Sequence, residues 1–226
     1  MFLTYYLKGL GGDIYNIETD QNIYTDSQTI YLPESLSFNQ SKKASTKLFQ
    51  IILSHLWAQN FYETWSNKVL LKLKDKGESM NQFLKIFCRL ECIRLDHCIR
   101  RDLPGLWAQQ ASLRSREKNN IDTWNAWKNK SKVLSAKEST SSTSLSLISK
   151  FVNDPLPILE VFQHEFQVQE LHKILDSKTA VQKEDFRASL QKFLDENLDH
   201  QDQDENQKEQ IEVDQVDGDQ TKGEPQ

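Results

Sequence analysis

The sequence predicts a mainly α-helical protein: a helical bundle around one central apolar helix, with a small N-terminal β element and a disordered acidic C-terminal tail. Apolar side chains recur at helical spacing from Met80 to Ile99 and leave little of that surface polar, which is typical of a helix surrounded by neighbours. Three Ile-Tyr pairs before Pro33 indicate short strands. Beyond Asp199 apolar residues almost vanish, so that segment cannot offset its ordering entropy by burial.

The N-terminal stretch combines a short helix with strands. Residues 1–12 are expected to form a helix closed by glycines that permit left-handed geometry, namely Gly9, Gly11 and Gly12. Turn-forming residues separate the three predicted strands, which lie at Ile14-Tyr15, Ile23-Tyr24 and Ile30-Tyr31. These two or three strands form either a β-hairpin or a β-meander.

The first long helix is predicted from Ser41 to about Trp65, with His55 among its apolar side chains. A lone histidine on such a face is most often a satisfied core residue. After this helix, Val69–Lys74 alternates weakly between apolar and polar residues, which leaves either a frayed helix end or an edge strand.

The central helix is predicted to begin with a capping box, in which Ser79 and Gln82 satisfy free amides of the first turn. It is predicted to stop at Asp102, which can cap a new helix that has Pro104 in its first turn.

Helices are also predicted at 104–118 and 121–134, and Trp124 and Trp127 share one face of the second in a spacing typical of core packing. The Ser/Thr-rich run Ser139–Ser146 has no means of burying itself and is expected to be a loop.

The C-terminal part is predicted to form an antiparallel pair of helices, Ile158–Asp176 and Val181–Leu198, with Phe186, Leu190 and Phe193 turned inward. The predicted domain organisation therefore has four parts. Residues 1–135 form a helical domain with an N-terminal β element, and residues 136–157 form a Ser/Thr- and Pro-containing linker with room for a short helix. Residues 158–198 form a helical pair packing on the body, and residues 199–226 form a disordered acidic tail.

Charge is distributed unevenly along the chain. Residues 195–226 hold twelve acidic residues and two lysines, whereas residues 1–194 hold 26 basic and 21 acidic residues. The basic residues of the body are dispersed, so the sequence predicts no nucleic-acid partner.

Three cysteines, Cys88, Cys92 and Cys98, fall within the central helix, an arrangement that does not indicate a disulfide framework and fits a reducing compartment. The N-terminus lacks a basic region and a long apolar run, so neither a signal peptide nor a membrane span is predicted. We expect a cytoplasmic protein.

Two charged residues interrupt the apolar surface of the central helix. Glu91 and Arg94 lie one turn apart and are predicted to form a structural ion pair, because either charge alone in a core would be costly. The chain contains no recognisable catalytic motif, and we expect a protein that is not an enzyme, with no catalytic, cofactor-binding or metal-ligating residues.

An alternative interpretation starts from Cys88, Cys92 and His97 as a metal or thiol site. Cys88 and Cys92 are four residues apart, so both thiolates can face one zinc ion, but His97 and Cys98 are adjacent and cannot both reach it. Small apolar residues in a buried helix account for the same pattern more simply.

Two blocks of sequence resemble a known family. One contains Leu32, Pro33 and Glu34 together with the helix that follows; the other contains Glu91 and Arg94, followed by Leu103-Pro104-Gly105-Leu106. Their order and spacing over residues 10–110 resemble the N-terminal region of the nitric oxide reductase activation proteins and their rubisco-activation relatives (NorD and CbbO type).

The resemblance implies a non-enzymatic adaptor that assists a MoxR-class AAA+ ATPase in activating a target metalloenzyme, either nitric oxide reductase-like or rubisco-like. It also implies family-motif positions at Leu32, Pro33, Glu34, Pro104, Gly105 and Leu106. The family's C-terminal von Willebrand factor A domain has no counterpart in these 226 residues. The chain is therefore expected either to work with a separate von Willebrand factor A protein or to be a degenerate or split-gene remnant with only a protein-binding role.

Overall fold

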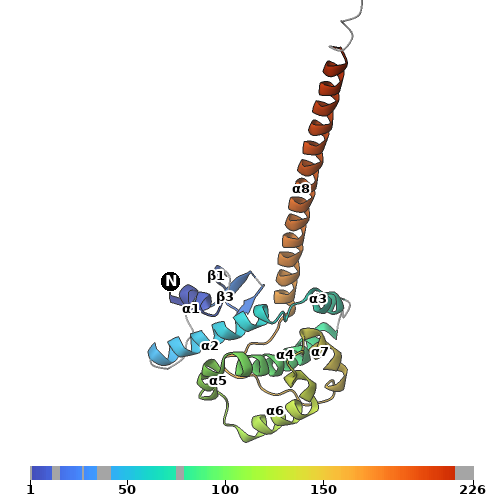
Figure 1. Ribbon diagram of the computed structural model, residues 1–226. Coiled ribbons are helices and arrows are strands. Elements are labelled where there is room, and N and C mark those ends of the chain that lie inside the picture. Colours follow the sequence, from blue (N-terminus) through green and yellow to red (C-terminus); the bar gives the residue numbers. More distant parts are fainter. Residues whose placement is uncertain (1, 12–15, 27, 35–41, 75–78, 217–226) are drawn as a thin grey trace, which may run out of the picture. The chain divides into compact units, whose positions relative to one another are not determined.

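The computed structural model describes residues 2–11, 16–26, 28–34, 42–74 and 79–216 (Figure 1). These residues are mainly helical and include a small three-stranded sheet near the N-terminus, which confirms the predicted fold class at that level. The chain divides into two compact units, residues 1–178 and 179–226. None of the described helices combines the length and the apolar composition needed to cross a bilayer.

The sheet follows the short helix α1 (Phe2–Gly9) and consists of β1 (Asn16–Thr19), β2 (Tyr24–Thr25) and β3 (Thr29–Leu32). Its strand order is β1-β3-β2. The antiparallel pair β2–β3 is the predicted hairpin, but β1 runs parallel to β3, so the meander alternative is wrong. The predicted strand at Ile14-Tyr15 lies outside the described residues.

The helix α2 (Lys42–Phe61) ends four residues before the predicted Trp65 because the chain closes it with a Schellman motif. The amide of Thr64 donates to the carbonyl of Gln59 (2.8 Å), and the amide of Glu63 donates to Asn60 (3.1 Å). Glu63 has φ +53°, in the left-handed region where glycine is usual. This turn directs Thr64 into the core, where it is completely buried.

Replacing Glu63 by glycine is expected to raise the free energy of unfolding by about 0.5–1 kcal/mol. A left-handed backbone conformation costs a residue with a Cβ about 1–2 kcal/mol, which glycine avoids. The greater conformational entropy of glycine in the unfolded chain cancels about 0.5–1 kcal/mol of this gain. Urea denaturation measures the change, with Glu63→Ala as the control that keeps the Cβ. A glycine variant no more stable than the alanine variant would contradict this interpretation of the turn.

The central helix α4 (Met80–Asp102) belongs to both hydrophobic clusters of the first unit. Its N-terminal half contributes Leu84, Phe87, Cys88 and Leu90 to one cluster, and its C-terminal half contributes Leu95 and Ile99 to the other. α4 contacts α2, α5 and α7 (Figure 1). The helix therefore has the central position that its apolar surface predicts.

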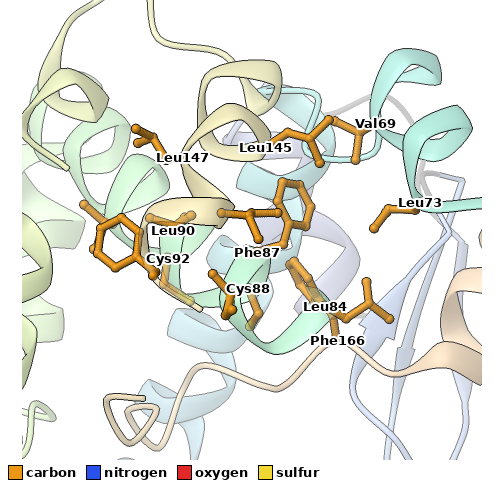
Figure 2. Close-up of a cluster of buried hydrophobic side chains, with 14 of the residues drawn as sticks. Val69, Leu73, Leu84, Phe87, Cys88, Leu90, Cys92, Leu145, Leu147 and Phe166 are labelled. Atoms are coloured by element: carbon orange, nitrogen blue, oxygen red, sulfur yellow. The ribbon is translucent and has the colours of Figure 1, made fainter. Parts of the chain in front are cut away.

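Figure 2 shows the first of these clusters, in which Phe87 and Leu84 of α4 lie beside Phe166. Residues 69–74, predicted as either a frayed helix end or an edge strand, belong to a separate helix, α3 (Asn67–Lys74). This helix packs Val69 and Leu73 into the cluster. Burying such side chains stabilises the fold by about 1.5–3 kcal/mol each.

The predicted side-chain caps of α4 and of the helix after it are both wrong. Ser79 stands at the N-cap but makes no side-chain cap hydrogen bond. Asp102 is the last residue of α4, and its carboxylate accepts from Arg101 instead of capping the next helix. That helix, α5 (Pro104–Ala111), has Leu103 at its N-cap and Pro104 in its first turn, as expected.

The helix α6 (Lys118–Lys130) and the 3-10 turn η2 (Lys132–Ser135) occupy the second predicted segment, 121–134, and α5 ends seven residues before the predicted 118. Trp124 and Trp127 are buried, and their indole N–H groups donate to the carbonyls of Ile158 and Pro155 (3.0 Å each).

The Ser/Thr-rich run predicted as a loop is instead a helix, α7 (Ser141–Leu147), followed by the 3-10 turn η3 (Ile148–Lys150). Its hydroxyl groups bind backbone atoms: the Ser141 hydroxyl donates to the Glu63 carbonyl (2.7 Å) and Thr143 accepts from the Thr140 amide (3.1 Å). Residues 136–157, predicted as a linker, thus supply buried side chains to the core, namely Leu145, Leu147, Ile148 and Phe151.

Residues 158–167 were expected to begin a helix, but they form no helix. The side chain of Asn120 binds both backbone groups of Ile158, accepting from its amide (2.8 Å) and donating to its carbonyl (3.1 Å). Phe162 and Phe166 in this segment are nonetheless buried. Contacts from α6 replace the hydrogen bonds that a helix would have made.

A single helix, α8 (Val168–Val216), replaces the predicted helical pair and also includes residues 199–216 of the tail that was predicted to be disordered. Leu171 and Ile174 are buried in the first unit, and the Lys173 ammonium lies 3.0 Å from the carboxylate of Asp20. Phe186, Leu190 and Phe193 are exposed, so the prediction that they turn inward is wrong. Residues 217–226 lie outside the described residues.

Candidate functional site

Glu91 and Arg94 form an ion pair on α4, with 2.6 Å between Nη2 of the arginine and Oε2 of the glutamate. Nε of Arg94 donates to the other carboxylate oxygen at 2.8 Å, which makes the pair bidentate. The Thr64 hydroxyl donates to Glu91 (2.6 Å), and Arg94 donates to the Tyr62 carbonyl (3.0 Å). The Schellman turn after α2 is therefore bonded to the middle of α4.

This network is almost completely removed from water, since the side chains of Glu91 and Arg94 are 0% and 2% exposed. Burial alone would lower the pKa of Arg94, but the neighbouring carboxylate of Glu91 raises it above its ordinary value. The guanidinium of Arg94 is consequently held in its charged form by Glu91. The ion pair has a structural role, because both carboxylate oxygens of Glu91 already accept hydrogen bonds from protein donors.

Arg94 also lines a pocket of about 400 Å³. The pocket lies between the turn after α2, the start of α3, the C-terminal half of α4 and the approach to α7. Its cationic lining residues are Lys68, Arg94, Arg101 and Lys137, and Glu63 is its one carboxylate. Lys68, Arg101 and Lys137 come from separate elements and carry no sequence signal, so sequence reasoning missed them.

The cysteine cluster has a different environment from a reactive or metal-binding one. The Cys88 thiol is buried and donates to the carbonyl of His164 (3.3 Å), and Figure 2 shows it among apolar side chains. A hydrogen bond with Cys88 and then burial raise the pKa of Cys92. Burial likewise lowers the pKa of the partly exposed His97. Among the described residues, no three His, Cys, Asp or Glu side chains are placed to hold one metal ion.

Cys98 is the cysteine that reaches the pocket. Burial raises its pKa, although the guanidinium groups of Arg94 and Arg101 act in the opposite direction. A thiol with a raised pKa is a poor nucleophile at neutral pH, since the thiolate is the reactive form.

One buried histidine, His55, and one half-buried histidine, His164, lie elsewhere in the first unit. Nε2 of His55 is 3.0 Å from the side-chain nitrogen of Gln110, and its ring packs on Phe162 with 4.9 Å between centroids. Burial lowers the pKa of His55 to about 4. Burial and then the neighbouring His55 lower the pKa of His164 to about 3. Both rings are neutral at pH 7, and His55 acts as a core residue, as expected.

The family-motif positions lie together only in part. Leu32 of β3 and Leu106 of α5 are both buried in the second hydrophobic cluster. Glu34 is exposed after the strand, and Pro104 and Gly105 are exposed in the first turn of α5.

Searches against protein-family models, curated proteins and solved structures gave no match to this chain.

Proposed function

We propose that the chain is a non-enzymatic adaptor that binds a partner protein through the second unit, residues 179–226. The observation that carries the proposal is an apolar stripe on α8, made by Phe186 and Leu190, which are 68% and 47% exposed. These two residues are one helical turn apart and point to one face, which Phe193 extends. Large apolar side chains gathered on an exposed helix face are typical of protein-binding sites.

The mode of binding follows from the helical pattern. An amphipathic helix binds by laying apolar side chains spaced three and four residues apart into a groove of its partner. Charged residues such as Lys183 and Arg187 flank the stripe and supply the polar rim of such an interface. Most helical stability comes from packing of the apolar face, so partner binding also supports this part of α8.

The partner class comes from the family resemblance. The proposed partner is a MoxR-class AAA+ ATPase, and the proposed outcome is activation of a target metalloenzyme that is nitric oxide reductase-like or rubisco-like. A separate von Willebrand factor A protein would complete the set of domains that the family combines.

Replacing Phe186 and Leu190 together by aspartate is expected to abolish recovery of the ATPase with the tagged full chain from its native host, because each aspartate places a charge in the apolar contact. Mass spectrometry identifies and quantifies the recovered protein. The matched control is the Ala188→Asp/Gln191→Asp double variant, which adds the same charge to the opposite face of the same turns and should retain binding. Absence of a MoxR-class ATPase, or equal recovery with the stripe variant, would count against the proposal.

A further inference from the structure

We propose that the pocket lined by Arg94 binds a small organic phosphate monoester. This inference is independent of the α8 stripe, because every residue involved belongs to the first unit. A volume of about 400 Å³ lies in the range of small-molecule sites and is too small for a folded partner.

The first support is positive charge that the protein does not neutralise. Lys68 and Lys137 both line the pocket, and neither has a salt bridge with any described residue. Nε and Nη2 of Arg101 each donate to the Asp102 carboxylate at 2.8 Å, so Arg101 adds less unneutralised charge to the pocket than the lysines do. Two unpaired ammonium groups beside one carboxylate, Glu63, leave the pocket with an excess of positive charge that suits a doubly charged anion.

The second support is an unused donor at the pocket. Nε and Nη2 of Arg94 make all of its hydrogen bonds to described residues, whereas Nη1 has no partner among them. The Arg94 side chain as a whole is only 2% exposed, but Nη1 is not among the fully buried atoms that lack a partner, so solvent or a ligand can reach this nitrogen. A guanidinium nitrogen held rigidly by Glu91 is pre-organised to donate to an anionic oxygen, at little further loss of side-chain entropy.

The lining residues narrow the ligand to a phosphate that carries an organic group. Phe61 and Tyr62 supply aromatic surface beside the cationic residues, and Ser142 adds a hydroxyl group. Lysine, arginine and hydroxyl groups together are the usual donors to phosphate oxygens. The aromatic side chains offer an apolar contact that inorganic phosphate would leave unused.

Titration calorimetry of the full chain with phenyl phosphate at pH 7.5 tests the proposal. We expect binding with a Kd below about 1 mM, weaker binding of inorganic phosphate, and little binding of benzoate, which has one charge. Lys68→Ala/Lys137→Ala is expected to weaken phenyl phosphate binding at least about tenfold, since it removes both charged groups that the described residues leave unpaired at the pocket. Both lysines are exposed, so their removal should leave the fold intact.

The control variant is Lys118→Ala/Lys150→Ala, which removes two exposed lysines that do not line the pocket. Lys118 also matches Lys68 in standing in the first turn of a helix. This variant should bind phenyl phosphate as the native chain does. The proposal is overturned if the native chain does not bind phenyl phosphate, if benzoate binds equally well, or if both double variants lose binding to the same extent.

Discussion

Replacing Arg94 by methionine is expected to lower the free energy of unfolding by about 3–5 kcal/mol, because the substitution leaves a buried carboxylate without its cation. The Glu91 side chain is 0% exposed in the native chain, so its carboxylate depends on protein donors such as the guanidinium. The variant also removes the donor to the Tyr62 carbonyl that holds the turn after α2. Guanidinium denaturation of the purified chain measures the loss.

The Glu91→Leu/Arg94→Met double variant separates this cause from a simple loss of packing. Removing both charges avoids the stranded carboxylate, so the double variant is expected to be about 2 kcal/mol more stable than the Arg94→Met single variant. A single variant that loses less than about 1 kcal/mol, or a double variant whose loss equals the sum of both single losses, would show that the pair is not buried as described.

Acid is expected to destabilise the first unit through His55 and His164, whose pKa values are lowered in the folded chain. The pKa values of His55 and His164 are about 4 and about 3 in the folded chain. An unfolded histidine has a pKa of about 6.5, so the unfolded chain binds more protons and stability falls as the pH drops from about 7 towards 4. At pH 5 the two residues together are expected to cost about 4 kcal/mol relative to pH 8.

Glu170 acts in the opposite direction over part of this range. Burial raises its pKa to about 7 in the folded chain, so its contribution to stability improves as the pH falls from 7 towards its unfolded value. Comparing the native chain with His55→Gln/His164→Gln at each pH cancels this contribution, and the stability difference between them should shift by about 4 kcal/mol between pH 8 and pH 5. A difference independent of pH would contradict the lowered pKa values of the two rings, as would NMR titration of either ring in the native chain above pH 6.

The central helix could be predicted from sequence because its signal is local. Apolar residues on nearly every side of 80–101 predict a surrounded helix, and three-residue spacing predicts the contact of Glu91 with Arg94. Both features appear in the structure. The Ile-Tyr pairs similarly indicated the strands β2 and β3, but not that β1 would lie parallel to β3, because register between distant strands leaves no local pattern.

The errors arise where side chains bind backbone groups far away in the sequence. Ser141 binds the carbonyl of Glu63, so a polar run forms the helix α7 against the core instead of a solvated loop. Asn120 and Trp124 bind Ile158 and make its non-helical conformation favourable despite helical spacing of the apolar residues. The pocket is equally invisible in the sequence, because four separate segments contribute to it.

Hydrogen exchange of the full chain, alone and mixed with the purified MoxR-class ATPase of the same organism, tests the adaptor proposal most directly. Slowed exchange at the amides of residues 179–193 in the mixture is the predicted result, because this segment carries the exposed stripe of Phe186 and Leu190. Unchanged exchange throughout the chain, or protection confined to residues 2–178, would contradict it.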